Sequence, residues 1–262
     1  MTVTTPTITR RPRESAPIAD FFSLYGLPHD SVEALTEVSR LRRRGRGRPL
    51  VLPVMKFAYF LVDGCISETV QAGKTRLWRE LMLFENISNS GVLPGSYSEE
   101  GFNPDTAGPI HGSVLSSCVF IEVPATKLSA LAATDPAIAL MLARMAAKRG
   151  ALTERLYTAT RASPVARVAA VLNYLAVPTR RKVIRRRADG ALVMSTAEEL
   201  VASGPSQADL SDALCLGRAT VEKAIAELRQ TGALRSFSPG ERTNRCYPIQ
   251  DRDLLRQIAL GG

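Results

Sequence analysis

Residues 206–234 read SQADLSDALCLGRATVEKAIAELRQTGAL, and this stretch decides the fold class of the C-terminal part of the chain. Gln207–Cys215 is predicted to be a short helix, and Leu216-Gly217 the tight turn after it. Arg218–Leu228 is predicted to be a second helix, because its apolar residues recur at the spacing of one buried helix face. Gly232 then ends that helix. Two short helices joined by a glycine-containing turn form a helix-turn-helix.

The second helix of this pair has a polar face near its N-terminus, which carries Arg218, Ala219, Glu222 and Lys223. This end of a recognition helix meets base edges in the major groove of DNA. An arginine pairs with guanine O6 and N7, and a glutamate accepts from cytosine N4. A helix N-terminus also attracts phosphate through its free N–H groups. The pattern therefore predicts binding to DNA.

A second contact with DNA is predicted after the helix pair. Leu234–Phe237 and Cys246–Ile249 are candidate strands, and Ser238–Asn244 (SPGERTN) is the polar turn between them. This arrangement is typical of a wing, in which Arg242 and Arg245 are placed to contact phosphates.

The distribution of charge agrees with a partner that is a polyanion. The 262 residues include 34 Lys or Arg and 25 Asp or Glu, a net charge of +9. Residues 161–262 contribute 16 basic and ten acidic groups, or +6, whereas residues 51–160 contribute nine and ten, or −1. The basic run Thr179–Arg187 (TRRKVIRRR) is either a solvated surface segment or a phosphate contact.

The N-terminal half has a different sequence pattern, dominated by short β-rich runs. Residues 1–17 are polar and Pro-rich and are predicted to form a loose tail, and the apolar spacing in Asp30–Leu41 predicts a helix. From Arg48 to Val123, short β-rich runs alternate with Gly, Pro and Asn. That pattern favours a β-roll or small barrel, with an irregular α+β arrangement as the alternative. Further along, Thr196–Ala202 is predicted to be a short helix.

A long helix is predicted to begin at Asp135, an N-cap residue with Pro136 at the first helical position. Its apolar residues follow a 3.5-residue period, which indicates a helix that packs along a partner. We therefore predict a dimer interface, with an ordinary core helix as the alternative. Ser163-Pro164 repeat the start signal, so Arg161–Ser163 is a candidate hinge. The predicted interface residues are Ile138, Met141, Met145, Leu152 and Leu156.

Other classes of function lack their sequence signals. The chain has no nucleophile elbow, phosphate-binding GxxxxGK[ST] loop or HExxH motif, so we expect no enzyme. Its four cysteines are too far apart to form a metal or redox motif, and we expect free thiols in a reducing cytoplasm and no cofactor or metal. We expect no secretory signal, because Met1–Pro17 has no apolar segment, and no membrane span, because Pro53 and Lys56 interrupt the longest apolar stretch, Val51–Val62.

The order of these elements resembles that of the Crp/Fnr family of bacterial transcription regulators. The resemblance runs from about Phe21 to about Ala259 and is strongest at Ala208–Leu234, where SDALCLGRATVEKAIAELRQTGAL is similar to the family's signature. It implies an α+β chain with a cyclic-nucleotide-binding-like β-roll, a long dimerisation helix and a winged helix-turn-helix. The implied divisions are a tail at 1–17, a sensor-like domain at 18–133, a dimerisation helix at 134–160 and a DNA-binding domain at 161–262.

The resemblance also implies partners and roles. It implies a cytoplasmic homodimer that is nucleoid-associated when bound to double-stranded DNA, with RNA polymerase as a further candidate partner. Arg218 and Lys223 match the family's base-reading positions, and Thr220 matches a phosphate-contacting one. Ala219 departs from the glutamate that many members carry, so the resemblance does not specify the target sequence.

The effector pocket of the family is altered in this sequence. Pro94–Glu100 resembles the start of the phosphate-binding cassette, with Glu100 at the ribose-binding position. The short helix of the cassette is largely missing, and Asp105, next to Thr106, stands where the phosphate-binding arginine belongs. Arginine binds a cyclic phosphate through paired charge-assisted bonds, which aspartate cannot make. We therefore expect a regulator that is not gated by cAMP. The alternative is an interaction protein that modulates another regulator through a mixed dimer.

Overall fold

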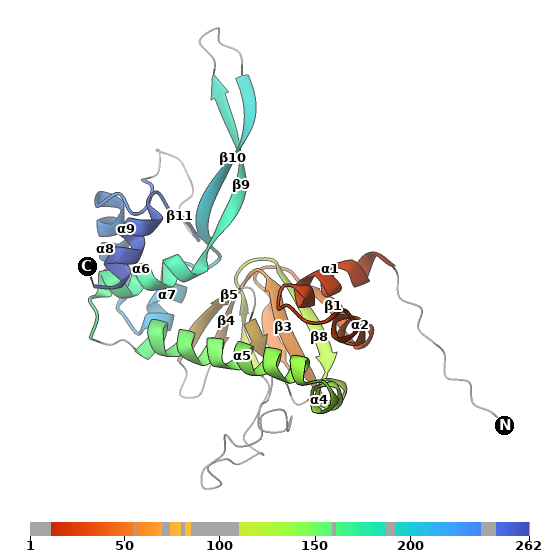
Figure 1. The fold of residues 1–262 in the computed structure, drawn as a ribbon. Coiled ribbons are helices and arrows are strands. Elements are labelled where there is room, and N and C mark those ends of the chain that lie inside the picture. Colours follow the sequence, from red (N-terminus) through yellow and green to blue (C-terminus); the bar gives the residue numbers. More distant parts are fainter. Residues whose placement is uncertain are drawn as a thin grey trace, which may run out of the picture.

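The structure is a computed structural model (Figure 1). It describes residues 12–54, 56–69, 74–79, 82–84, 110–158, 161–186, 192–236 and 245–261. For residues 12–15, 82–84, 181–186 and 192–197 it describes the backbone alone.

The chain is helical from residue 12, so the predicted tail is wrong for residues 12–17. Helix α1 (Pro12–Ser23) is followed by α2 (His29–Val38). The ring centroid of Phe60 lies 5.8 Å from that of Phe21 and 5.4 Å from that of Phe22. Burial of these aromatic rings explains why the segment before them is ordered as a helix.

The β-roll predicted between Arg48 and Val123 is present, and it begins earlier than expected. In the described part of the chain it consists of two four-stranded antiparallel sheets, in the orders β1-β8-β3-β6 and β2-β7-β4-β5. Leu41, expected at the end of a helix, lies in β1 opposite Ile121. The strands are β1 (Arg40–Arg44), β2 (Pro49–Leu52), β3 (Phe57–Asp63), β4 (Cys65–Thr69), β5 (Thr75–Arg79), β6 (Met82–Phe84), β7 (Ile110–Val114) and β8 (Cys118–Pro124).

The long helix starts where the sequence predicts. Helix α4 (Ala125–Thr134) is followed by α5 (Pro136–Thr153), which continues into the π-helical turn η3 (Glu154–Thr158). Asp135 caps α5 and accepts a hydrogen bond from the Ala137 N–H at 2.9 Å. The Ser31 hydroxyl donates to the other carboxylate oxygen at 2.6 Å, and this bond contributes most to the lowered pKa of Asp135.

The predicted interface residues, which lie on α5 and η3, pack into the chain's own core, which corrects their assignment to a partner helix. Each is at most 7% exposed within the single chain. Because the apolar row is already buried within the chain, a partner of α5 would contact the opposite face of the helix. The buried residues are Ile138, Met141, Met145, Leu152 and Leu156, and the opposite face carries Leu140, Ala143, Ala147 and Ala151.

The C-terminal part begins with α6 (Pro164–Leu175), which Ser163 caps as predicted by accepting from the Ala166 N–H. Strand β10 (Leu192–Ser203) pairs with β9 (Ala176–Arg186) along its length and with the short β11 (Cys246–Pro248) at its end. The predicted helix at Thr196–Ala202 is therefore wrong, because pairing with two strands overrides the local helical pattern.

Three further helices complete this part: α7 (Gln207–Leu214), α8 (Arg218–Gln230) and α9 (Arg252–Ala259). The hairpin predicted after α8 is reduced, in the described residues, to a bridge between Leu234 and Ile249. In the described ranges, no single helix is long and apolar enough to cross a membrane; the pair Ala125–Thr134 and Pro136–Thr158 passes that test only jointly, and it is bent by 119°.

Candidate nucleic-acid interface

The helix-turn-helix predicted from residues 206–234 is present. Helix α7 begins with a capping box, in which the Asp209 N–H donates to the Ser206 hydroxyl at 3.2 Å and the Ser206 N–H donates to the Asp209 carboxylate at 2.6 Å. Cys215 ends α7 in the left-handed conformation, with φ of 50°. This turn directs the chain into α8 after only Leu216 and Gly217.

Helix α8 is held by an apolar face and leaves its polar face free. The buried residues are those of the predicted helical stripe, so the exposed side is fixed with respect to the core. Gly217 makes no side-chain cap, so side chains leave the first N–H groups of α8 available to an anion. The buried residues are Val221, Ala224, Ile225 and Leu228, and the exposed ones are Arg218, Ala219, Glu222, Lys223, Ala226, Glu227 and Gln230.

The predicted base-reading residues come together on this exposed face. Arg218 Nε lies 3.0 Å from Glu222 Oε1, and the two side chains are 73% and 46% exposed. Among the described residues, Arg218 Nη1 and Nη2 make no hydrogen bond to protein. The guanidinium is thus oriented by one bond along the helix while its outer nitrogens remain available. Thr220 is half-buried on the first turn, and Lys223 is exposed on the next.

The two predicted wing arginines are not equivalent. Arg242 lies outside the described residues. Arg245 is half-buried, and its Nη1 donates to the Gly204 carbonyl at 3.0 Å and to Asp209 Oδ2 at 3.1 Å. These bonds fasten the chain before β11 to the start of α7, so Arg245 has an architectural role in this structure. A contact between Arg245 and DNA stays a prediction.

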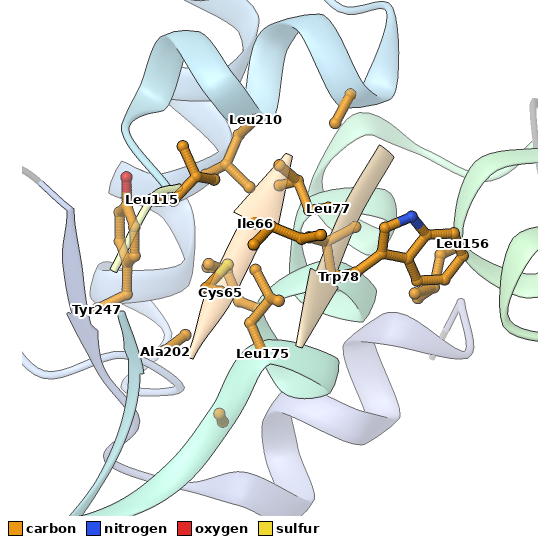
Figure 2. Packing of buried hydrophobic residues seen from close by; sticks show 14 of the residues in the cluster. Cys65, Ile66, Leu77, Trp78, Leu115, Leu156, Leu175, Ala202, Leu210 and Tyr247 are labelled. Carbon is orange, nitrogen blue, oxygen red and sulfur yellow. The ribbon is translucent and has the colours of Figure 1, made fainter. Parts of the chain in front are cut away.

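The helix-turn-helix packs directly on the β-roll. Figure 2 shows Ile66 of β4 and Leu77 of β5 among Leu210 of α7 and Leu175 of α6, while the ring of Trp78, the next residue of β5, points away from Leu210. All five side chains are fully buried in one continuous core. This core spans the sensor-like and C-terminal parts.

Two tyrosines strengthen this junction by pairing with the free edge of β5. The Tyr157 hydroxyl, from η3, accepts from the Leu77 N–H at 2.8 Å and donates to the Leu77 carbonyl at 2.7 Å. The Tyr174 hydroxyl, from α6, accepts from the Arg79 N–H at 3.0 Å. Burial raises the pKa of both tyrosines, which keeps the hydroxyls protonated. The free edge of β5 is thus hydrogen-bonded by side chains from η3 and α6, the segment that leads to the helix-turn-helix.

A buried charge cluster that no local sequence pattern predicts lies where α5 crosses the roll. Glu68 of β4 is 4% exposed, and its Oε1 lies 2.5 Å from Arg149 Nη2 of α5. The Trp78 indole N–H donates to the other Glu68 oxygen, and the Arg149 guanidinium lies 5.1 Å from the Trp78 ring centroid. The available signal was Arg149 itself, a charge in an otherwise apolar row. The predicted pocket residues Glu100, Asp105 and Thr106 lie outside the described residues.

Comparisons with known proteins identify the fold. No protein-family model matches the sequence, and neither does any curated protein. A cyclic nucleotide-binding domain containing protein from Listeria monocytogenes matches with a TM-score of 0.55 and 12% identity, over 91% of this chain and 99% of that chain. A CRP-family transcriptional regulator from Thermus thermophilus matches with a TM-score of 0.52 and 18% identity, over 84% of this chain and 97% of that chain. FixK2 from Bradyrhizobium japonicum matches with a TM-score of 0.52 and 17% identity, over the same shares of the two chains. The chain therefore has the fold of CRP/FNR regulators, with a cyclic-nucleotide-binding-type β-roll followed by a helical DNA-binding-type part.

Proposed function

We propose that this protein is a sequence-specific DNA-binding transcription regulator and not an enzyme. One observation carries the proposal: α8 is anchored by its apolar face and presents the polar N-terminal face with Arg218, Glu222 and Lys223. The solved structures that share its fold include proteins described as transcriptional regulators, which supports the same conclusion. Such a regulator would act in the cytoplasm on nucleoid DNA, with RNA polymerase as a second partner.

Thiol labelling along α8 tests the proposal. Burial raises the pKa of Cys65 to about 12 and of Cys118 to about 11, so both native thiols should stay unreactive. With Cys215 and Cys246 replaced by serine, Ala219→Cys introduces a thiol at the exposed N-terminal end of α8, and Gln230→Cys introduces the matched control at its other end.

Saturating operator DNA should slow alkylation at position 219 at least about tenfold and leave position 230 almost unchanged, because the N-terminal end of a recognition helix enters the major groove. Site-resolved mass spectrometry measures both rates. Equal rates at position 219 with and without DNA would contradict the proposed orientation.

The proposed regulator acts as a homodimer joined through the outer face of α5. Ala147 lies on that exposed face, between Arg144 and Lys148. Ala147→Arg would add like charges across a two-fold axis, so we expect the dimer dissociation constant to rise at least about tenfold. Light scattering measures the mass, and Ala147→Gln, which adds a long side chain without a charge, is the control. A variant that stays dimeric would place the interface elsewhere, and a wild-type monomer would favour the mixed-dimer alternative.

We also propose that cAMP and cGMP do not gate this regulator. The support comes from the sequence: Asp105 replaces the expected arginine, and two like charges 4 Å apart cost about 4 kcal/mol at an effective dielectric constant of 20. Isothermal titration with either nucleotide should show no binding. A low micromolar dissociation constant together with a gain in DNA affinity would contradict the assignment of Asp105 to the phosphate position.

A further inference from the structure

The hairpin of β9 and β10 extends well beyond the sheet to which it belongs. Strands β9 and β10 pair in unbroken register from Ala176↔Ala202 to Arg186↔Leu192. The third strand, β11, pairs with β10 at Val201–Ser203, and the N–H of Ile249, just after β11, donates to the Leu200 carbonyl at 2.8 Å. Beyond that point the described strands form a two-stranded ribbon, which projects away from the roll and the helices (Figure 1). We call residues 178–186 with 192–200 the ribbon.

The length of the ribbon is on the scale of a DNA groove. From Val177, which pairs next to β11, to Arg186 the chain advances nine residues. At about 3.3 Å per residue this is about 30 Å. Double-stranded DNA rises about 3.4 Å per base pair, so the ribbon matches about nine base pairs. A two-stranded ribbon is also one of the two elements that the major groove admits.

The ribbon carries five basic residues and two acidic ones. Opposite the basic residues of the outer part, β10 places neutral ones. Arg180 alone faces an acid, Glu198, and the nearby Glu199 already pairs with Arg235 at 3.0 Å. The outer pairs are Arg181↔Ala197, Lys182↔Thr196, Arg185↔Val193 and Arg186↔Leu192.

Basic residues occupy both faces of the ribbon. Because successive strand residues alternate between faces, Arg181 and Arg185 share one face, and Lys182 and Arg186 share the other. A ribbon with cations on both faces suits a site between two rows of negative charge. The two phosphate strands that border a DNA groove provide such rows.

The ribbon is joined to the helix-turn-helix by a short connection. Strand β10 ends at Ser203, and Ser206 already caps α7. The intervening Gly204 has φ of +119°, a conformation that favours glycine, and its N–H donates to the Arg245 carbonyl at 3.0 Å. A Cβ at this position would lie 2.9 Å from Cys65 Cβ of the roll. The connection between the base of the ribbon and α7 is therefore hydrogen-bonded to the chain before β11 and closely packed against the roll.

We infer that the ribbon is a second DNA-binding element, which enters a groove beside the half-site and contacts the phosphates on both sides of it. The inference rests on the proposed function, because it takes the duplex bound by α8 as the ligand. It adds contacts that do not depend on base sequence. These contacts extend the binding site outward by about nine base pairs per half-site.

Two duplexes separate this element from α8. One ends at the two half-sites, and the other extends each side by about twelve base pairs of random sequence. The test variant replaces Arg181, Lys182, Arg185 and Arg186 with threonine, which favours strands. The matched control, Arg181→Lys with Arg185→Lys and Arg186→Lys, keeps the charge.

On the long duplex we expect the threonine variant to bind at least about tenfold more weakly than wild type at low salt. The slope of log Kd against log salt should flatten by about 0.9 for each phosphate that the variant no longer neutralises. On the short duplex its affinity should equal that of wild type, which shows that the protein is folded. The lysine control should behave as wild type on both.

The inference would be overturned if the threonine variant bound the long duplex with the affinity and salt slope of wild type. If that variant also lost transcriptional activity, the ribbon would be a protein-binding element instead. The proposed function, sequence-specific binding, is contradicted by a different result: equal affinity of the wild-type protein for operator and random duplexes of the same length. In that case the inference stands if the threonine variant loses affinity for both long duplexes, and it falls otherwise.

Discussion

Replacing Arg218 with alanine should weaken binding to the operator by about 2–6 kcal/mol per homodimer, because each half-site loses a bidentate pair of hydrogen bonds to a base worth about 1–3 kcal/mol. This corresponds to a loss of affinity of at least roughly 30-fold. The structure supports a large effect, because Arg218 is 73% exposed and its outer guanidinium nitrogens bind nothing else among the described residues.

Fluorescence anisotropy on operator and random duplexes measures this effect. Lys127→Ala removes the same charge from an exposed position on α4, which belongs to the part of the chain that carries the β-roll, and should change neither affinity. The Arg218 variant should lose affinity for the operator and its preference at one base pair of each half-site. Equal weakening on both duplexes would show that Arg218 contacts phosphate rather than a base.

Replacing Arg149 with methionine should lower the free energy of unfolding by about 3–5 kcal/mol, because it leaves the Glu68 carboxylate buried without its ionic partner. Trp78 supplies a single indole N–H to Glu68 and cannot replace the missing positive charge. The variant also loses the guanidinium that lies over the Trp78 ring. The variant therefore loses two interactions that hold α5 against β4 and β5: the ion pair with Glu68 and the contact with the Trp78 ring.

Urea denaturation measures the destabilisation, and two further variants test its cause. Lys127→Met also replaces a cation with methionine, at an exposed position on α4, and should be nearly neutral. Glu68→Gln combined with Arg149→Met removes both charges and should recover most of the stability, since a neutral pair avoids the desolvation of an unpaired ion. A double variant as unstable as Arg149→Met would show that packing, not charge, dominates.

Local signals in the sequence were sufficient for the helix starts and the turn. Asp135 and Ser163 each cap the helix that follows them, because capping depends on residues within a few positions of one another. The apolar stripe of α8 likewise identified its exposed face, since a 3.6-residue period fixes which side is buried. The candidate interface was predictable for that reason.

Features that depend on distant residues were not predictable in the same way. The apolar row on α5 predicts a packing partner but cannot say whether that partner is another chain or the chain's own roll. Thr196–Ala202 has a helical pattern, and only its pairing with β9 and β11 makes it a strand. The Glu68–Arg149 pair joins residues 81 positions apart, so no local spacing indicates it.

Selection from random double-stranded DNA tests the central claim most directly. Purified protein is incubated with a library of random duplexes, and the bound fraction is amplified and sequenced over several rounds. The proposed homodimer should enrich an inverted repeat whose half-sites lie about 10–10.5 base pairs apart, or a multiple of that distance. The Arg218→Ala protein should lose the preference at one base pair of each half-site. Recovery of random sequences by the wild-type protein, at concentrations where DNA is bound, would contradict sequence-specific recognition by α8.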